Sequence, residues 1–119
     1  MAQTADAKSD QYVYFVNLED GDIVNSPLKI EMGVEGMTIE PAGPINENKG
    51  HHHLLVDTTY FEAGTIIPAT EKTIHFGKGQ TETEIQLSPG KHKLTLQFAD
   101  GVHRSYGKKM SKTIEITVE

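Results

Sequence analysis

The chain has 119 residues, a length typical of a single domain that folds on the burial of its own core. It carries 11 Lys and Arg against 17 Asp and Glu, and a formal net charge of -6 argues against binding to the phosphates of a nucleic acid. No apolar run approaches the ~20 residues of a membrane-spanning helix. Cysteine is absent, which excludes thiol catalysis, iron–sulfur clusters and cysteine-based zinc sites. Six histidines are the unusual feature of the composition.

The N-terminal segment comes first in chain order. Residues 1–10 are small and polar, and we expect a disordered tail there, followed by one domain over residues 11–119. Residues 1–8 lack the apolar region of a signal peptide, and a segment of this kind is what remains once a signal peptide has been removed. We therefore expect a periplasmic or secreted protein.

Apolar and polar residues alternate with a period of two along most of the domain, which predicts short strands. The clearest run is residues 92–98, where every second residue from His92 to Phe98 faces one side and the polar residues between them face the other. Residues 58–72 form a long connection. We expect further strands at residues 12–18, 23–24, 28–34, 51–57, 73–76, 82–87 and 114–118.

Seven to eight short strands separated by turn residues predict an all-β protein. An immunoglobulin-like antiparallel β-sandwich fits this pattern best, and a jelly roll or a small barrel is the alternative. Cysteine and tryptophan are both absent, so an antibody-type domain is excluded. No window shows a 3.6-residue apolar repeat, and we expect no helix longer than about two turns.

The triplet His51-His52-His53 opens the strand expected at residues 51–57. Alternate residues of a strand share a face, so His51 and His53 should point together, whereas His52 should point with the apolar residues that follow. Such a pair, joined by an imidazole from another element, is a common arrangement for a three-histidine site that binds zinc or copper.

The candidates for the additional ligand are His75, His92 and His103. His75 is expected to face away from its apolar neighbours, which leaves it free for a site. His103 follows the turn Asp100-Gly101, in a loop expected to fold over one end of the sandwich. His92 is expected to be a packed corner residue whose ring bonds across the corner, as a tyrosine does in many sandwich domains.

We therefore predict a metal site formed by His51, His53, His75 and His103, with copper or zinc as the ion. The structural alternative is that these histidines only make hydrogen bonds at strand ends. No catalytic residue is predicted, because no serine lies in a nucleophile elbow and residues 77–82 lack the spacing of a phosphate-binding loop.

Three segments of the chain resemble a known family. They are residues 50–57 (GHHHLLVD), residues 75–82 (HFGKGQTE), and residues 89–92 (PGKH) together with Leu94, Leu96, Asp100 and His103. Over residues 12–118 the chain is similar to the DUF4399 family, exported bacterial domains of unknown function with HHHLL and HFGKGQTE motifs. The resemblance implies an all-β fold and a periplasmic or secreted setting, and it implies no enzyme activity.

The function that these observations favour is a non-enzymatic binding domain whose histidines gather around copper or zinc. The alternative is a structural or protein-interaction module that meets a protein partner through an exposed apolar surface. A metal-dependent hydrolase is the third candidate, and it requires an open coordination position beside a cleft. Converging imidazole nitrogens would favour the first of the three.

Overall fold

The computed structural model describes residues 10–119, which form nine strands and one short 3-10 helix. In chain order these are β1 (Tyr12–Phe15), β2 (Ile23–Val24), β3 (Leu28–Glu35), β4 (Thr38–Ile39), β5 (Lys49–Val56), β6 (Thr73–His75), β7 (Glu82–Ile85), β8 (Gly90–Ala99), η1 (Lys108–Met110) and β9 (Ser111–Val118). The tail expected at residues 1–10 lies outside the described residues, except for Asp10. Within the described chain no helix is long and apolar enough to span a membrane.

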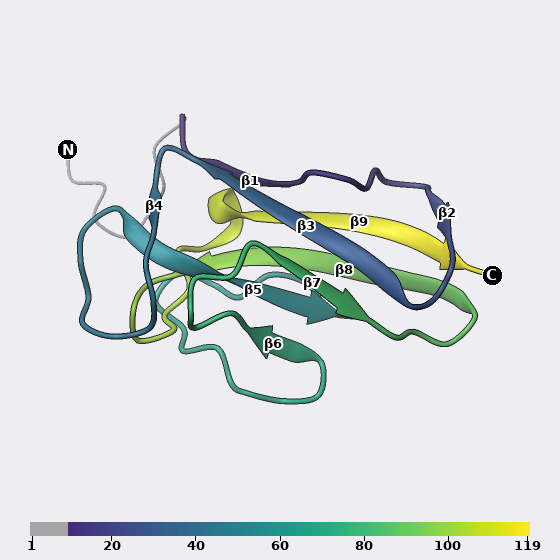
Figure 1. Ribbon diagram of the computed structural model, residues 1–119. Helices are drawn as coiled ribbons and strands as arrows, with labels where there is room; N and C mark the ends of the chain where they lie inside the picture. The colour runs from purple at the N-terminus through teal and green to yellow at the C-terminus, as the bar shows by residue number, and fades with distance from the viewer. Residues whose placement is uncertain (1–9) are drawn as a thin grey trace.

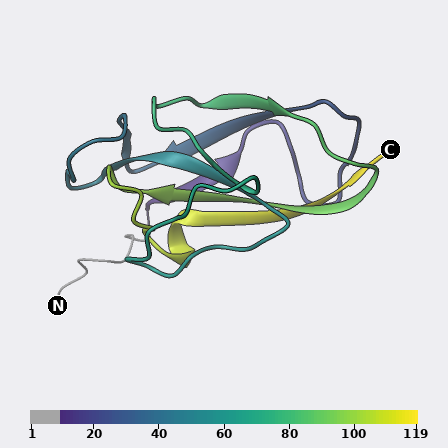
Figure 2. The ribbon, with the colours of Figure 1, turned by 90° about the horizontal axis from the view of Figure 1, so that it is seen from below.

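The strands form two sheets that pack face to face (Figures 1 and 2). The smaller sheet has three strands in the order β1-β3-β7, and its pairs are antiparallel. The larger sheet has six strands in the order β2-β9-β8-β5-β4, with β6 also paired to β5, and it curls into a half-barrel. The long antiparallel pair β8–β9 runs the length of the molecule in Figure 1.

The all-β prediction is confirmed. The structure has nine strands where seven to eight were expected, and two of the strand pairs are parallel where an antiparallel sandwich was expected. The additional strand is β4, which has only two residues and therefore no period that a sequence pattern could reveal. In addition, β4 pairs with β5 in parallel, and β2 pairs with β9 in parallel. The absence of helical periodicity correctly predicted the lack of a long helix, since η1 has three residues and is the one helix of residues 10–119.

The main core lies between the two sheets and is built from the inward faces of their strands. In the first part of β3 every second residue is buried, and buried and more exposed residues alternate in the same way in the second half of β9. The core residues are Val13, Phe15, Leu18, Leu28, Ile30, Met32, Leu54, Val56, Phe76, Leu94, Leu96, Phe98, Met110, Ile114, Ile116 and Val118.

The opposite face of β5 and β8 is buried as well, contrary to the polar face expected for residues 92–98. Thr95 and Gln97 are fully buried because the long connection after β5 covers them. The Thr95 hydroxyl donates to the Thr58 carbonyl oxygen at 2.9 Å, and the Phe61 N–H donates to Gln97 Oε1 at 3.0 Å. A small apolar cluster of Leu55, Ile67 and Ala99 lies under the same cover. The histidine pair of β5 faces this covered side.

Candidate metal centre

Strand β5 separates the three consecutive histidines onto its two faces, as the period of two predicts. His52 points into the main core, where its ring lies edge-on to Phe98 with centroids 5.2 Å apart. His51 and His53 point to the covered face, and their ring centroids are 4.7 Å apart. All three side chains have no exposed surface. The triplet therefore contributes two side chains to a candidate site and one to the core.

His103 is the third ring of the candidate site. It lies in the loop after β8, and its Nδ1 is 3.1 Å from Nε2 of His51 and 3.1 Å from Nε2 of His53. These three nitrogens all lie within 4.8 Å of one another. We refer to His51, His53 and His103 as the three-histidine centre. Two of its members are buried and His103 is partly exposed.

The spacing of the ring nitrogens suits a small transition-metal ion. A tetrahedral ion with bonds of about 2.0–2.1 Å to nitrogen holds its ligand atoms about 3.3 Å apart. The two distances of 3.1 Å that join His103 to its partners are close to this value. Without an ion, each neutral ring has one N–H, and the direction of the two contacts of Nδ1 of His103 depends on the tautomers of the three rings. Three ring nitrogens that converge in this way could hold one metal ion.

Burial keeps the rings of this centre uncharged at neutral pH. The pKa of His51 is lowered to about 4, first by burial and then by repulsion from His103 and His75. The pKa of His53 is lowered to about 2, again first by burial and then by its histidine neighbours. Burial also lowers the pKa of His103. Neutral imidazole is the form that binds a metal ion, so the fold holds these side chains ready as ligands.

The outer nitrogens of the buried pair are poorly satisfied. Nδ1 of His51 and Nδ1 of His53 are buried and make no hydrogen bond of ordinary geometry within the described residues. The backbone of Glu40 acts to raise the pKa of His51, and the backbone of Gln97 acts to raise the pKa of His53, both against the larger lowering by burial. Both rings turn Nε2 toward the centre. Metal-bound histidines commonly hold their second nitrogen by a hydrogen bond, which Nδ1 of these two rings lacks among the described residues.

His75 lies beside the centre. It is paired directly with His53 across β5 and β6, and their ring centroids are 4.5 Å apart. The centroids of the His75 and His103 rings are also 4.5 Å apart. Nε2 of His75 donates to the Pro68 carbonyl oxygen at 3.0 Å, because a carbonyl can only accept. The lone pair of the neutral ring is therefore on Nδ1.

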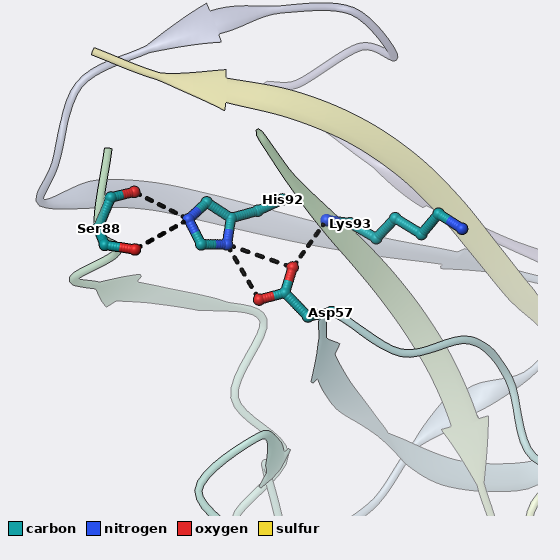
Figure 3. Close-up of polar contacts among 4 residues, drawn as sticks. All are labelled: Asp57, Ser88, His92 and Lys93. Carbon is teal, nitrogen blue, oxygen red and sulfur yellow. Dashed lines mark hydrogen bonds and ion pairs between the residues drawn. The ribbon is translucent and has the colours of Figure 1, made fainter. Parts of the chain in front are cut away.

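His92 lies apart from the centre, at the corner where β8 begins (Figure 3). Its Nδ1 is 3.2 Å from Oδ1 and 3.0 Å from Oδ2 of Asp57, and Oδ1 also accepts the Lys93 N–H at 3.1 Å. Its Nε2 is 2.8 Å from the Ser88 carbonyl oxygen. His92 thus bonds across a corner, as predicted, and links the end of β5 to the turn before β8.

The contacts of Asp57, His92 and Ser88 resemble a catalytic triad, but Nε2 of His92 faces a backbone carbonyl oxygen more closely than the serine hydroxyl. Nε2 of His92 lies 3.4 Å from the Ser88 hydroxyl oxygen and closer, at 2.8 Å, to the Ser88 carbonyl oxygen. Since both ring nitrogens face acceptors, this geometry suits the doubly protonated ring, which has no lone pair with which to take a proton from serine. The contact is therefore a structural link.

Sequence reasoning missed the importance of Asp100. The sequence places Asp100 in a turn dipeptide and among the residues that carry the family resemblance, and neither pattern predicts a role for it. In the structure its buried carboxylate accepts hydrogen bonds from the loop that carries His103. The available signal was its position three residues before His103, since an Asp at the start of a turn commonly bonds to the backbone of the residues that follow.

Comparison with known proteins agrees with the resemblance drawn from the motifs. The family model described as "Domain of unknown function (DUF4399)" matches residues 30–119. No curated protein and no solved structure matches the chain.

Proposed function

We propose that this chain, which belongs to the DUF4399 family, is a binding domain for a divalent transition-metal ion, copper or zinc, and has no catalytic activity of its own. The observation that carries the proposal is the convergence of three ring nitrogens, from His51, His53 and His103, within 4.8 Å of one another. Nitrogen-only donors of this kind suit copper and zinc. Copper(II) should bind more tightly than zinc, following the usual order of divalent ions.

We further propose that His75 supplies a fourth ligand through Nδ1. Its hydrogen bond to Pro68 leaves the lone pair on that nitrogen, and its ring contacts the rings of both His53 and His103. A fourth ligand on the partly exposed side would complete a tetrahedral shell around zinc. Replacing His75 should therefore weaken binding and leave the other three ligands able to hold the ion.

The setting that we propose for this activity is periplasmic or secreted. The resemblance to exported domains supports it. For the fold we propose a relationship to immunoglobulin-like sandwiches, supported by two facing sheets around one core. Neither statement bears on the metal site, which rests on its own geometry.

Calorimetric titration with Cu²⁺ and with Zn²⁺ tests the proposal. We expect the wild type to bind one ion, and His51→Ala, His53→Ala and His103→Ala each to weaken binding at least tenfold. His52→Leu is the matched control, because His52 lies on the same strand, is equally buried and faces the other way. It should bind the ion as the wild type does. No heat of binding in the wild type, or equal loss in the control, would contradict the proposal.

A further inference from the structure

The loop that carries His103 is closed by one buried side chain. Oδ1 of Asp100 accepts the N–H of Val102 at 3.0 Å and the N–H of Arg104 at 2.9 Å. Oδ2 of Asp100 accepts Nε of Arg104 at 2.9 Å. Asp100 is only 5% exposed, so these bonds are shielded from water. A single carboxylate therefore fixes the loop at three points.

The backbone of the same loop is in a conformation that needs this support. His103 has φ +69, in the left-handed region that residues other than glycine adopt at a cost in free energy. Its N–H donates to the Asp100 carbonyl oxygen, and the Asp100 N–H donates to the Arg104 carbonyl oxygen, both at 2.9 Å. This turn directs the His103 ring at the histidine pair of β5. The His103 carbonyl oxygen also accepts the Ile67 N–H at 2.9 Å, so the Asp100 carboxylate adds side-chain hydrogen bonds to a turn that backbone hydrogen bonds also hold.

Asp100 also has an electrostatic effect on the centre. Its charge acts to raise the pKa of His51 and of His103, against the larger lowering by burial. The side chain of its partner, Arg104, is 44% exposed, whereas that of Asp100 is 6% exposed. Water therefore screens the guanidinium more than the carboxylate. The centre consequently combines neutral rings with a nearby negative charge, which offsets part of the cost of burying a cation.

We propose that Asp100 is the positioning residue of the three-histidine centre, and that its charge makes the centre favour a divalent over a monovalent ion of the same element. This inference rests on the proposed function. Asp100 does not touch the ion, since its oxygens are taken by Val102 and Arg104. It acts by holding His103 and by adding one negative charge near the rings. The first effect changes the affinity for any ion, and the second changes the affinity for Cu²⁺ more than for Cu⁺.

Two variants separate charge from position. Asp100→Asn keeps a carbonyl oxygen that can accept the two loop N–H groups and removes the charge. Asp100→Glu keeps the charge and displaces it by one methylene. The affinities for Cu²⁺ and for Cu⁺ are measured by competition with chromophoric chelators, with Cu⁺ kept reduced under anaerobic conditions. Changes in residues that support metal ligands typically weaken metal binding about 10–100-fold.

For Asp100→Asn we expect the Cu²⁺ affinity to fall about tenfold further than the Cu⁺ affinity. For Asp100→Glu we expect both affinities to fall by a similar factor, so that their ratio stays at the wild-type value. If Asp100→Asn does not fold, as judged by circular dichroism, Asp100→Ser replaces it, because serine also removes the charge and keeps an oxygen that can accept a loop N–H; an unchanged ratio of the Cu²⁺ and Cu⁺ affinities in that variant overturns the charge effect.

The other outcomes distinguish this inference from the proposed function. Equal losses for both ions in Asp100→Asn would show that Asp100 only supports the loop, which overturns the role of its charge. Unchanged affinities for both ions would overturn the whole inference while metal binding stands. A wild type that binds neither ion would overturn the proposed function and this inference together.

Discussion

Nδ1 of His103 lies 3.1 Å from Nε2 of His51, although 52 residues separate them in the sequence. His51 is fixed within a central strand of the larger sheet, and His103 is held by a short loop at the end of β8. Because β5 and β8 are antiparallel neighbours, with His51 opposite Ala99, the loop after Ala99 begins beside the histidine pair. The centre is therefore a direct result of strand pairing.

Removal of metal should leave the domain folded. The main core between the sheets contains none of the three ligands, and a chain of this length can fold on its own burial. After treatment with a chelator, we expect the β-sheet signal in circular dichroism and a cooperative thermal transition to persist. Added Zn²⁺ should then raise the stability by about 2.7 kcal/mol at a hundredfold excess over the dissociation constant.

His103→Ala provides the control for this experiment, because it removes one ligand from the exposed loop and leaves β5 intact. At the same Zn²⁺ concentration, its melting temperature should rise clearly less than that of the wild type, because binding is at least tenfold weaker. A wild type that unfolds when the metal is removed would show instead that the centre is a structural element of the fold.

Local pattern was sufficient to predict which side chains share a face. The alternation along residues 51–57 placed His51 and His53 together and separated His52 from them, because the two faces of a strand follow from backbone geometry alone. The same reasoning separated His75 from Ile74 and Phe76, and β6 indeed turns His75 toward His53.

Features that depend on distant contacts could not be predicted in this way. The choice of His103 over His92 depends on a left-handed residue in a five-residue loop and on which strands pair. The burial of Thr95 and Gln97 depends on a connection that folds back over them. A period of two reports the two faces of a strand, but it does not reveal that both are covered.

His52→Leu should stabilise the domain. Both ring nitrogens of His52 are buried without a hydrogen-bond partner among the described residues, and a buried unpaired polar group costs about 1–3 kcal/mol. Leucine is similar in volume and suits the apolar surroundings. We expect the midpoint of urea unfolding of metal-free protein at pH 7.5 to rise by an amount equivalent to about 1 kcal/mol.

The gain should increase in acid. Burial and repulsion from His51 lower the pKa of His52 to about 4, so between pH 6.5 and 4 the unfolded chain binds a proton that the folded chain does not. This proton uptake destabilises the folded wild type by up to about 1.4 kcal/mol per pH unit, and His52→Leu removes it. A variant that is less stable than the wild type at both pH 7.5 and pH 5 would show that the ring packs better than leucine.

Gln97→Met should destabilise the cover over the histidine face. The side-chain oxygen of Gln97 accepts the Phe61 N–H at 3.0 Å, and its nitrogen donates to the Gly107 carbonyl oxygen at 3.0 Å. Methionine has a similar shape, leaves the Phe61 N–H without its acceptor and removes one of two hydrogen bonds to the Gly107 carbonyl oxygen, which still accepts the Met110 N–H. We expect a cost of about 1–3 kcal/mol. Chemical denaturation measures the loss. Hydrogen exchange should show faster exchange of the Phe61 amide, and a protected amide would contradict the assigned role.

The link between His92 and Asp57 should make the stability depend on pH in a predictable direction. The hydrogen bond to Asp57 raises the pKa of His92. Partial burial acts to raise the pKa of Asp57, but the hydrogen bonds from His92 and from the Lys93 N–H outweigh it and lower that pKa. The raised histidine pKa contributes stability that is fully present below pH 6.5 and is lost as the pH rises through the folded value. The lowered carboxyl pKa contributes stability above pH 3.8 that is lost as the pH falls through its folded value.

The pair therefore stabilises the fold most between about pH 4 and pH 6.5. His92→Gln removes the charged ring, and we expect it to cost about 1 kcal/mol at pH 5.5 and less at pH 8.5. Subtracting the unfolding free energies of wild type and variant at each pH cancels the titration of the shared groups whose pKa does not depend on His92. Asp57→Asn should lose the same pH-dependent part, and the double variant should lose little more than either single variant, because the two side chains act through one contact. An equal difference at both pH values would mean that His92 contributes by packing alone, with no charged bond to Asp57.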